Sequence, residues 1–289
     1  MKNMRKLVGL VLALTLCCGL LSTGTAATFT DAHGNVIELD ETLEAYAAFT
    51  LHGAEDAARK SETNLGDLWA DALRWFAVSG EINAFFEEDD VAAGLTAIDA
   101  DPDHIVALWN GGNLRADIPE GKFGAEQLAE VLPYPNKVAV VYMTGAQLAE
   151  ALEAASQGLP YAEETAAACA AFMQVSGLKY TVDTAKEYDK GEPYGDNWFQ
   201  AASLNRVAIS EVNGQAFDPE AVYAVITSNA NFNGMDSSYI FKEAAEANEK
   251  STITTAVVRD VIWMYLAAGE NVVPEAYAEA QGRIVVSGQ

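Results

Sequence analysis

Three stretches of the sequence carry side chains that could hold a small ligand. Asn110 is followed by a pair of glycines, of which Gly112 is the second, and then by Arg115. Glycines after a strand let the backbone approach a ligand closely, while an amide and a guanidinium donate hydrogen bonds. Tyr134 offers an aromatic face for stacking, and the carboxylate of Asp236 suits a pair of neighbouring hydroxyls.

Each of these residues also has a simpler interpretation. Gly111 and Gly112 could merely make a turn, Tyr134 could pack in the core, and Arg115 could pair with the nearby Asp117. The types and spacing alone leave both interpretations open.

No catalytic constellation or metal centre is expected elsewhere. The sequence has no phosphate-binding P-loop motif, no Gly-x-Ser-x-Gly, no zinc-type Cys/His spacing and no serine triad. Asp31 and His33, in Asp-Ala-His-Gly, could ligate a metal, but a site with two metal ions needs further histidines and aspartates, and only His52 and His104 remain. We therefore interpret His33 as a turn residue and expect no metal and no cofactor.

The N-terminus predicts export. Lys2, Arg5 and Lys6 precede an apolar stretch over residues 7–21, and small residues follow up to Ala27, which is the layout of a secretory signal peptide. A retained membrane anchor is the alternative, but the stretch is shorter than the roughly 20 residues that span a bilayer. We expect cleavage near Ala27, a secreted or extracytoplasmic protein with no lipid anchor, and no membrane span in the mature chain.

The composition bears on which partners the protein can have and on what stabilises its fold. The chain has 42 acidic against 17 basic residues and a net charge of −25, so nucleic acid is not an expected partner. Removing the signal peptide takes two of the three cysteines, which leaves Cys169, expected to be a small buried residue, and no disulfide. Packing must therefore hold the fold together.

The first half of the chain predicts the elements that position the candidate residues. A hairpin is expected around residues 33–35, and a helix capped by Ser61 with apolar residues at helical spacing up to Phe76. The predicted elements that follow are an exposed acidic run at 87–90, a strand at 105–109, a helix at 124–132, a strand at 138–143, and a helix capped by Thr144 that runs to about 157.

The second half adds mostly strands. We expect a strand at 174–183 with Gly177 as a bulge or point of close approach, strands at 206–212 and 223–227 with a tight turn at Asn213-Gly214, an amphipathic helix at 253–268 closed by Gly269, and a final strand at 283–286. Strands and helices mix without strict alternation, which favours an α+β fold with a mixed sheet and packed helices. The predicted division is a signal peptide at 1–27, a short lead with a hairpin at 28–60, and one domain at 61–289.

From about residue 61 to 286, the order of motifs resembles the C-terminal, substrate-binding domain of the 5′-nucleotidase family. The motifs are Glu62-Thr63-Asn64-Leu65-Gly66-Asp67 opening a helix, Asn110-Gly111-Gly112 with Arg115, Leu132-Pro133-Tyr134, Thr144-Gly145 before a helix, Gln174-Val175-Ser176-Gly177-Leu178, and Tyr223 leading to Asn229. The N-terminal metallophosphoesterase domain of that family, which binds two metal ions and attacks the phosphate, has no counterpart expected here.

The resemblance implies roles for individual residues. Asn110 would hydrogen-bond a base or orient its loop, Arg115 would meet a phosphate, Tyr134 stands where the family has a stacking phenylalanine, and Asp236 stands where a carboxylate binds ribose hydroxyls. With Gly112, Asn229 and Phe232, these make up the predicted nucleoside or nucleotide site.

Departures from the family pattern affect the same site. The second stacking aromatic is replaced by Ala230, with Phe232 the nearest aromatic, and the glycine-rich ribose loop is altered around Asp236. An arginine that follows the first helix in the family has no clear equivalent, since Arg74 comes too early and Ser79 lies near its place. Phosphate affinity is accordingly expected to be weak.

Three hypotheses of function follow. The first is a secreted, stand-alone domain that binds a nucleoside or nucleotide without hydrolysing it. The second is a substrate-recognition subunit that acts with a separate metallophosphoesterase. The third is an extracellular protein-interaction module that has lost its ligand. Loss of the second aromatic favours the third hypothesis, and the survival of Asn110, Arg115 and Tyr134 favours the first.

Overall fold

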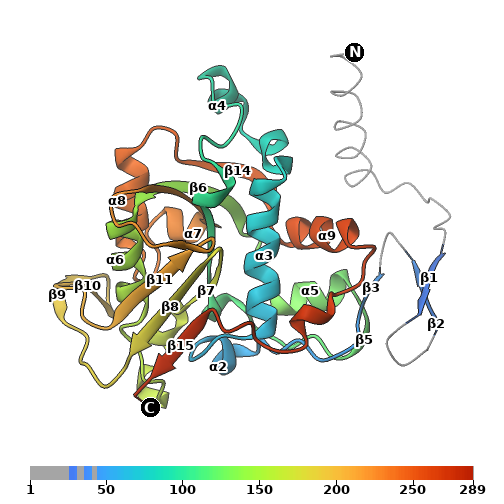
Figure 1. Cartoon of the computed structure of the whole chain (residues 1–289), viewed down its shortest axis with the longest axis horizontal. Coiled ribbons are helices and arrows are strands. Elements are labelled where there is room, and N and C mark those ends of the chain that lie inside the picture. Colours follow the sequence, from blue (N-terminus) through green and yellow to red (C-terminus); the bar gives the residue numbers. More distant parts are fainter. Residues whose placement is uncertain (1–25, 31–35, 41–43, 289) are drawn as a thin grey trace.

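A five-stranded mixed sheet forms the centre of the molecule. The computed structural model describes residues 26–30, 36–40 and 44–288 (Figure 1). The sheet has the order β14-β6-β13-β4-β7, and its strands are β4 (Ile105–Asn110), β6 (Lys137–Thr144), β7 (Met173–Ser176), β13 (Val222–Ser228) and β14 (Thr252–Val257). Within it β13 and β4 run parallel, and the other neighbours are antiparallel. This arrangement confirms the predicted mixed sheet.

Both faces of the central sheet are buried. The apolar side chains of its strands point alternately into a core on one face and a core on the other. In β4, Ile105, Ala107 and Trp109 enter one core, whereas Val106 and Leu108 enter the other. Successive strand residues point to opposite faces, so an uninterrupted apolar strand of this kind needs a cover on each side.

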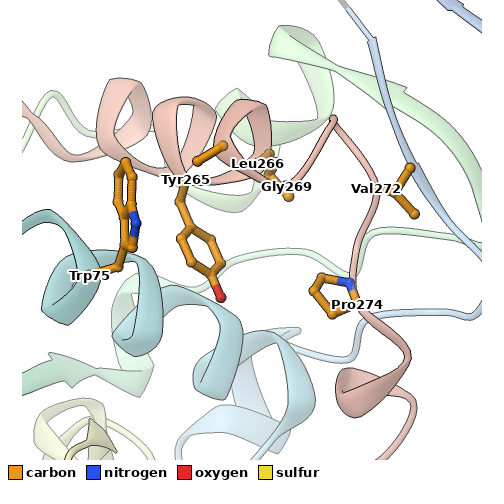
Figure 2. Close-up of a pocket in the computed structure, with 7 residues that line it drawn as sticks. Trp75, Tyr265, Leu266, Gly269, Val272 and Pro274 are labelled. Atoms are coloured by element: carbon orange, nitrogen blue, oxygen red, sulfur yellow. The ribbon is translucent and has the colours of Figure 1, made fainter. Parts of the chain in front are cut away.

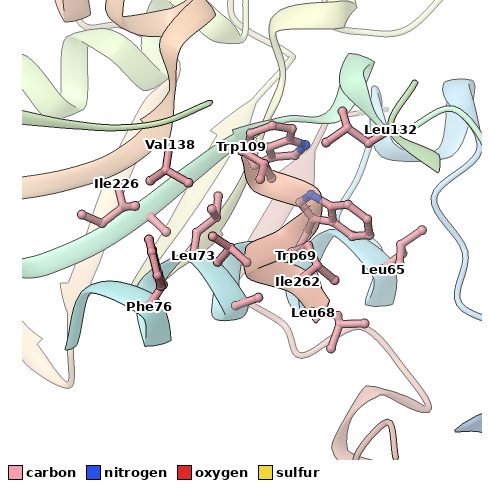
Figure 3. Close-up of a cluster of buried hydrophobic side chains, with 14 of the residues drawn as sticks. Leu65, Leu68, Trp69, Leu73, Phe76, Trp109, Leu132, Val138, Ile226 and Ile262 are labelled. Atoms are coloured by element: carbon pink, nitrogen blue, oxygen red, sulfur yellow. The ribbon is translucent and has the colours of Figure 1, made fainter. Parts of the chain in front are cut away.

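Helices α3 (Asn64–Val78), α5 (Ala125–Val131) and α9 (Val258–Ala268) cover one face. Their apolar side chains join those of the sheet in a cluster that we call the α3-side core; it includes Trp69, Phe76, Trp109, Ile226 and Ile262. Figure 3 shows these side chains meeting between α3, α9 and the strands. Trp69 and Trp109 are wholly buried, so this is the main hydrophobic core.

Helices α6 (Gly145–Ala155) and α8 (Tyr239–Ala247) cover the other face, together with a second sheet (Figure 1). That sheet has the order β12-β11-β8-β15, with strands β8 (Leu178–Asp183), β11 (Val207–Val212), β12 (Gln215–Ala216) and β15 (Ile284–Ser287). Their buried residues form the α6-side core, which includes Leu148, Phe172, Tyr180, Val225 and Phe241. Cys169 is buried in it, as predicted, and is not in a disulfide.

Smaller elements complete the described chain. A ribbon of β9 (Lys190–Tyr194) and β10 (Trp198–Ala201) stands beside the second sheet, β3 (Glu44–Ala47) pairs with β5 (Gly121–Gly124), and β1 (Ala26–Thr30) pairs antiparallel with β2 (Val36–Asp40). The turn residues predicted at 33–35 lie outside the described residues. The short helices are α2 (Glu55–Ala58), α4 (Glu88–Ala92), α7 (Asn229–Phe232), η1 (Glu81–Phe85), η2 (Pro102–His104), η3 (Gly111–Asn113), η4 (Glu163–Thr165), η5 (Ala168–Ala171) and η6 (Glu275–Tyr277).

Several predicted elements are confirmed, and the cap of α3 is corrected. The strands at β4 and β6, the helices α5 and α6, and the Thr144 cap of α6 are present as predicted. The cap of α3 is Thr63, not Ser61: Thr63 Oγ1 accepts a hydrogen bond from Gly66 N at 3.0 Å. Ser61 Oγ instead donates to Ala57 O, so it completes the preceding α2 turn.

The segment predicted as one strand at 174–183 is two strands in different sheets. Gly177 separates β7 from β8 with a φ of +81°, which an L side chain rarely adopts. It also packs closely, because a Cβ there would lie 2.8 Å from both Arg74 Nε and Asn213 Oδ1. The chain therefore crosses from the central to the second sheet at this glycine.

The helix predicted at 253–268 is wrong in its first part. Residues 252–257 form strand β14 on β6, and α9 begins only at Val258. The β-branched Thr252, Ile253, Thr254 and Thr255 favour a strand, and the tertiary pairing with β6 decides it. The tight turn at Asn213-Gly214 likewise joins β11 to the short β12, because β13 lies in the other sheet.

In the described part of the chain, none of the helices has the length and apolarity that crossing a membrane demands.

Candidate functional site

The parallel pair in the central sheet brings the two candidate loops to the same edge. β13 pairs with β4 so that Ile226 lies opposite Ala107, and both strands end three or fewer residues later, at Ser228 and Asn110. The turn that leads to Arg115 and the loop that leads to Asp236 therefore start side by side. In such sheets the edge beyond the carboxyl ends of parallel strands is where ligands bind.

The paired glycines at this edge pack against other segments of the chain and do not border an open space. A Cβ on Gly111 would lie 1.8 Å from Ala58 O, and one on Gly112 would lie 2.6 Å from Ala170 O. Gly111 N also donates to Phe172 O at 2.7 Å. The glycines thus let α2 and η5 pack against the turn, and Gly112 shapes the site through that packing.

Arg115 and Tyr134 lie together. Arg115 Cζ is 5.8 Å from the centroid of the Tyr134 ring, within the range of a cation–π contact. Tyr134 is 47 % exposed, so it is not a core residue. Asp117, the alternative partner of Arg115, accepts hydrogen bonds from Gly53 N and Ala54 N, both at 2.8 Å.

A buried polar network fixes the loop that carries Asp236. Asn231 Nδ2 donates to Thr227 Oγ1 at 2.7 Å, and Ser238 Oγ donates to Asn231 Oδ1 at 3.1 Å. Tyr194 Oη donates to Gly234 O at 2.6 Å from the β9–β10 ribbon. Asp236 itself has a φ of +54°, a backbone state that persists only where its surroundings hold it.

The positive charges of two arginines act on Asp236. Burial raises the pKa of Asp236, and the positive charges of Arg59 and Arg115 act against that rise. The carboxyl group therefore lies within electrostatic reach of both guanidinium groups, although 115 and 236 belong to different loops.

Arg59 is the site residue that the sequence interpretation missed. It follows α2, and its Nη1 donates to Ala166 O at 3.0 Å, which holds the guanidinium near the site. Arg74 was considered as the equivalent of the family arginine that follows the first helix. Its Nε instead donates to Ile105 O at 2.8 Å. No motif marks Arg59 within the sequence; only the packing of α2 against the Gly111 turn places it here.

Asn229 and Phe232, which were both predicted to belong to the site, contact other parts of the fold. Asn229 Oδ1 accepts a hydrogen bond from Lys137 N at 2.9 Å, which ties α7 to the start of β6, just after the Tyr134 loop. Phe232 is partly buried against the α6-side core.

Two buried polar atoms at this edge lack a protein partner. Asn110 Oδ1 and Ser237 Oγ make no hydrogen bond within the described residues, and both side chains are almost wholly buried. Because an unsatisfied buried polar atom is costly, these two atoms could take hydrogen bonds from a ligand or from water.

A separate hollow lies between α3 and α9 and contains none of the predicted site residues. It is lined by Trp75, Tyr265, Leu266, Ala268, Gly269, Val272 and Pro274 (Figure 2). Its volume of about 160 Å³ is well below the ~300–1,000 Å³ usual for sites that enclose small ligands. We therefore keep the candidate site at the β4–β13 edge.

Among the described residues there is no group of three or more His, Cys, Asp or Glu side chains that could hold a metal ion. Asp31 and His33, considered for that role, lie outside the described residues.

The sequence matches one protein family over most of its length. Residues 42–243 match the family described as 5′-nucleotidase, C-terminal domain. A curated relative, the trifunctional nucleotide phosphoesterase protein YfkN of Bacillus subtilis, is 29 % identical over 206 residues, which are 71 % of this chain and 11 % of that protein.

Solved structures show the same fold. A 5′-nucleotidase precursor from Thermus thermophilus superposes with a TM-score of 0.60 at 27 % identity, over 85 % of this chain and 39 % of that one. The NAD nucleotidase of Haemophilus influenzae superposes with a TM-score of 0.58 at 13 % identity, over 90 % of this chain and 48 % of that one. The chain thus spans less than half the length of each of these proteins.

Proposed function

Since the chain belongs to the family of 5′-nucleotidase C-terminal domains, we propose that it binds a nucleoside or nucleotide at the carboxyl edge of β4 and β13. The observation that carries this proposal is the convergence of Arg59, Arg115 and Asp236 beside the exposed ring of Tyr134. Two guanidinium groups suit a phosphate, and a carboxylate suits ribose hydroxyls.

The proposed role is recognition, and the chain alone is not proposed to hydrolyse its ligand. The YfkN relative is named a phosphoesterase, so hydrolysis in this family is supported, but the sequence has no Gly-x-Ser-x-Gly or serine-triad pattern that would supply a nucleophile with its base. We propose that any hydrolysis needs a separate metal-bearing phosphoesterase.

Calorimetric titration of the purified protein with AMP, adenosine and uridine tests the binding proposal. Saturable binding of AMP is expected, and Arg115→Ala should weaken it by about tenfold or more, as loss of a charge-assisted contact does. Lys122→Ala is the matched control, because Lys122 is an exposed cation paired with Glu44. Absence of heat with every ligand would reject the proposal and favour an interaction module.

Mixing experiments test whether the protein is a substrate-recognition subunit of a separate phosphoesterase. Phosphate release from AMP that appears only when a separately purified metallophosphoesterase is added would support a substrate-recognition subunit. Equal release with and without this chain would contradict it.

We also propose that the protein is exported. The charged and apolar N-terminal sequence supports this. Mass spectrometry of the protein recovered outside the cell should show a chain that begins near Thr28; an intact N-terminus found only in the cytoplasm would contradict the proposal.

A further inference from the structure

The aromatic ring at the candidate site already has a charged neighbour. Arg115 Cζ lies 5.8 Å from the centroid of the Tyr134 ring, close enough for the ring to attract the guanidinium. Arg115 N donates to Val131 O at 2.9 Å, so the arginine backbone is anchored to the end of α5, just before the Tyr134 loop. The ring and the guanidinium therefore form a cation–π pair at the candidate site.

The two rings predicted to stack on a base both have other contacts. Phe232, the aromatic nearest to Ala230, packs against the α6-side core, on the face of the central sheet opposite to the cluster that contains Leu114 and Leu132. Neither Ala230 nor the exposed Met235 has a ring that could stack on a base. Of the two rings predicted to stack on a base, Phe232 thus packs against the α6-side core, and Tyr134 already contacts Arg115.

The charged groups, by contrast, are held in place. Arg59 is fixed by its bond to Ala166 O, and the loop of Asp236 is fixed by the Thr227–Asn231–Ser238 network. Two guanidinium groups and one carboxylate at one edge are complementary to an ester that has a phosphate at one end and two hydroxyls at the other.

We propose that Tyr134 positions Arg115 instead of holding a base, so that the site selects a sugar phosphate with neighbouring hydroxyls and is nearly indifferent to the base. This inference rests on the proposed function, because it concerns the same site. Ribose 5-phosphate is the simplest ligand of that chemical class.

The affinities of the unaltered protein for three ligands test the inference. Ribose 5-phosphate and AMP should bind with dissociation constants within about threefold of each other, whereas adenosine should bind at least about tenfold more weakly. Similar binding of AMP and adenosine with much weaker binding of ribose 5-phosphate would overturn the inference and leave the proposed function standing. No binding of either AMP or adenosine would overturn both.

Substitutions at Tyr134 separate positioning from stacking. Tyr134→Leu should weaken AMP and ribose 5-phosphate by the same factor, and Tyr134→Phe should restore both, since a ring that supports a cation needs no hydroxyl. If Tyr134→Leu weakens AMP and adenosine but leaves ribose 5-phosphate unchanged, the ring stacks on the base and the inference fails. Tyr134 is a surface residue, and thermal unfolding of each variant checks that the fold is kept.

Discussion

At the scale of single residues, the candidate site combines side chains with ligand-binding chemistry and residues that merely allow close packing. Asn110, Arg115, Tyr134 and Asp236 were predicted from the sequence, and Arg59 was not. Gly112 was identified for a reason that the structure changes, because Ala170 occupies the space beside it. The side-chain type was therefore informative where the chemistry is unusual, and less so where a residue's role depends on its neighbours.

Arg59 is predicted to bind the anionic part of the ligand. Arg59→Gln should lower the affinity for AMP by about tenfold or more, as loss of a charge-assisted contact does, and should leave adenosine binding nearly unchanged. The adjacent Lys60→Gln is the matched control, since Lys60 pairs with Asp56 on the surface. Equal losses in the two variants, measured by calorimetry, would mean that only net charge matters.

Gly111 is predicted to be indispensable for packing. Gly111→Ala places a methyl group 1.8 Å from the backbone oxygen of Ala58, so the free energy of unfolding should fall by roughly 3 kcal/mol or more, at the upper end of overpacking. Gly269→Ala is the control, because its nearest neighbour would be 3.5 Å away. Denaturant titration of both variants decides the matter, and equal stabilities would show that the approach of Ala58 does not restrict this position to glycine.

At the scale of elements, the C-terminal segment is held onto α3 by a polar cluster. Arg283 Nη2 donates to Asp71 Oδ2 at 2.6 Å, and Gln281 N donates to Asp67 Oδ2 at 3.0 Å. Glu62 accepts hydrogen bonds from Arg283 N and Ile284 N. These contacts align β15 so that it pairs in parallel with β8.

Asp67 should make stability fall as the pH rises. Its burial raises the pKa of Asp67 from 3.8 to about 8, despite the opposing charge of Arg283. The folded state therefore keeps a proton that the unfolded state loses. The stabilisation is fully present below about pH 3.8 and is lost progressively as the pH approaches 8.

The variant Asp67→Asn removes this titration. It should be more stable than the unaltered protein near pH 8, by an amount on the order of a few kcal/mol, and the two should converge toward pH 4. The exposed Asp196→Asn should instead follow the unaltered protein. Denaturant unfolding at several pH values measures the difference; parallel pH profiles for all three proteins would show that Asp67 does not titrate in this way.

At the scale of the whole molecule, a strongly negative chain surrounds a locally positive site. The net charge is −25, whereas the ligand edge presents Arg59 and Arg115. Long-range repulsion slows the approach of an anion, and the local arginines act only at short distance.

Salt should therefore speed the association of an anionic ligand. The association rate constant of AMP should rise between low and moderate ionic strength. Salt screens the repulsion between charges that are farther apart than the Debye length, which is about 10 Å at 0.1 M. Neutral adenosine is the control and should show little change. Stopped-flow measurements in which AMP association slows with salt would show that the two arginines dominate the field.

Elements whose signals are local could be predicted from the amino-acid sequence. The buried strand β4, the Thr144 cap of α6 and the extent of α5 depend on neighbouring residues, so periodicity and capping residues identified them. The family also followed from the order of short motifs along the chain. Three features could not be predicted in this way: residues 252–257 are a strand, Gly177 divides two sheets, and the charges of Arg59 and Arg115 both act on Asp236. These features depend on contacts between segments far apart in the chain, and no local pattern encodes the partner of a strand or the charge that a loop will face.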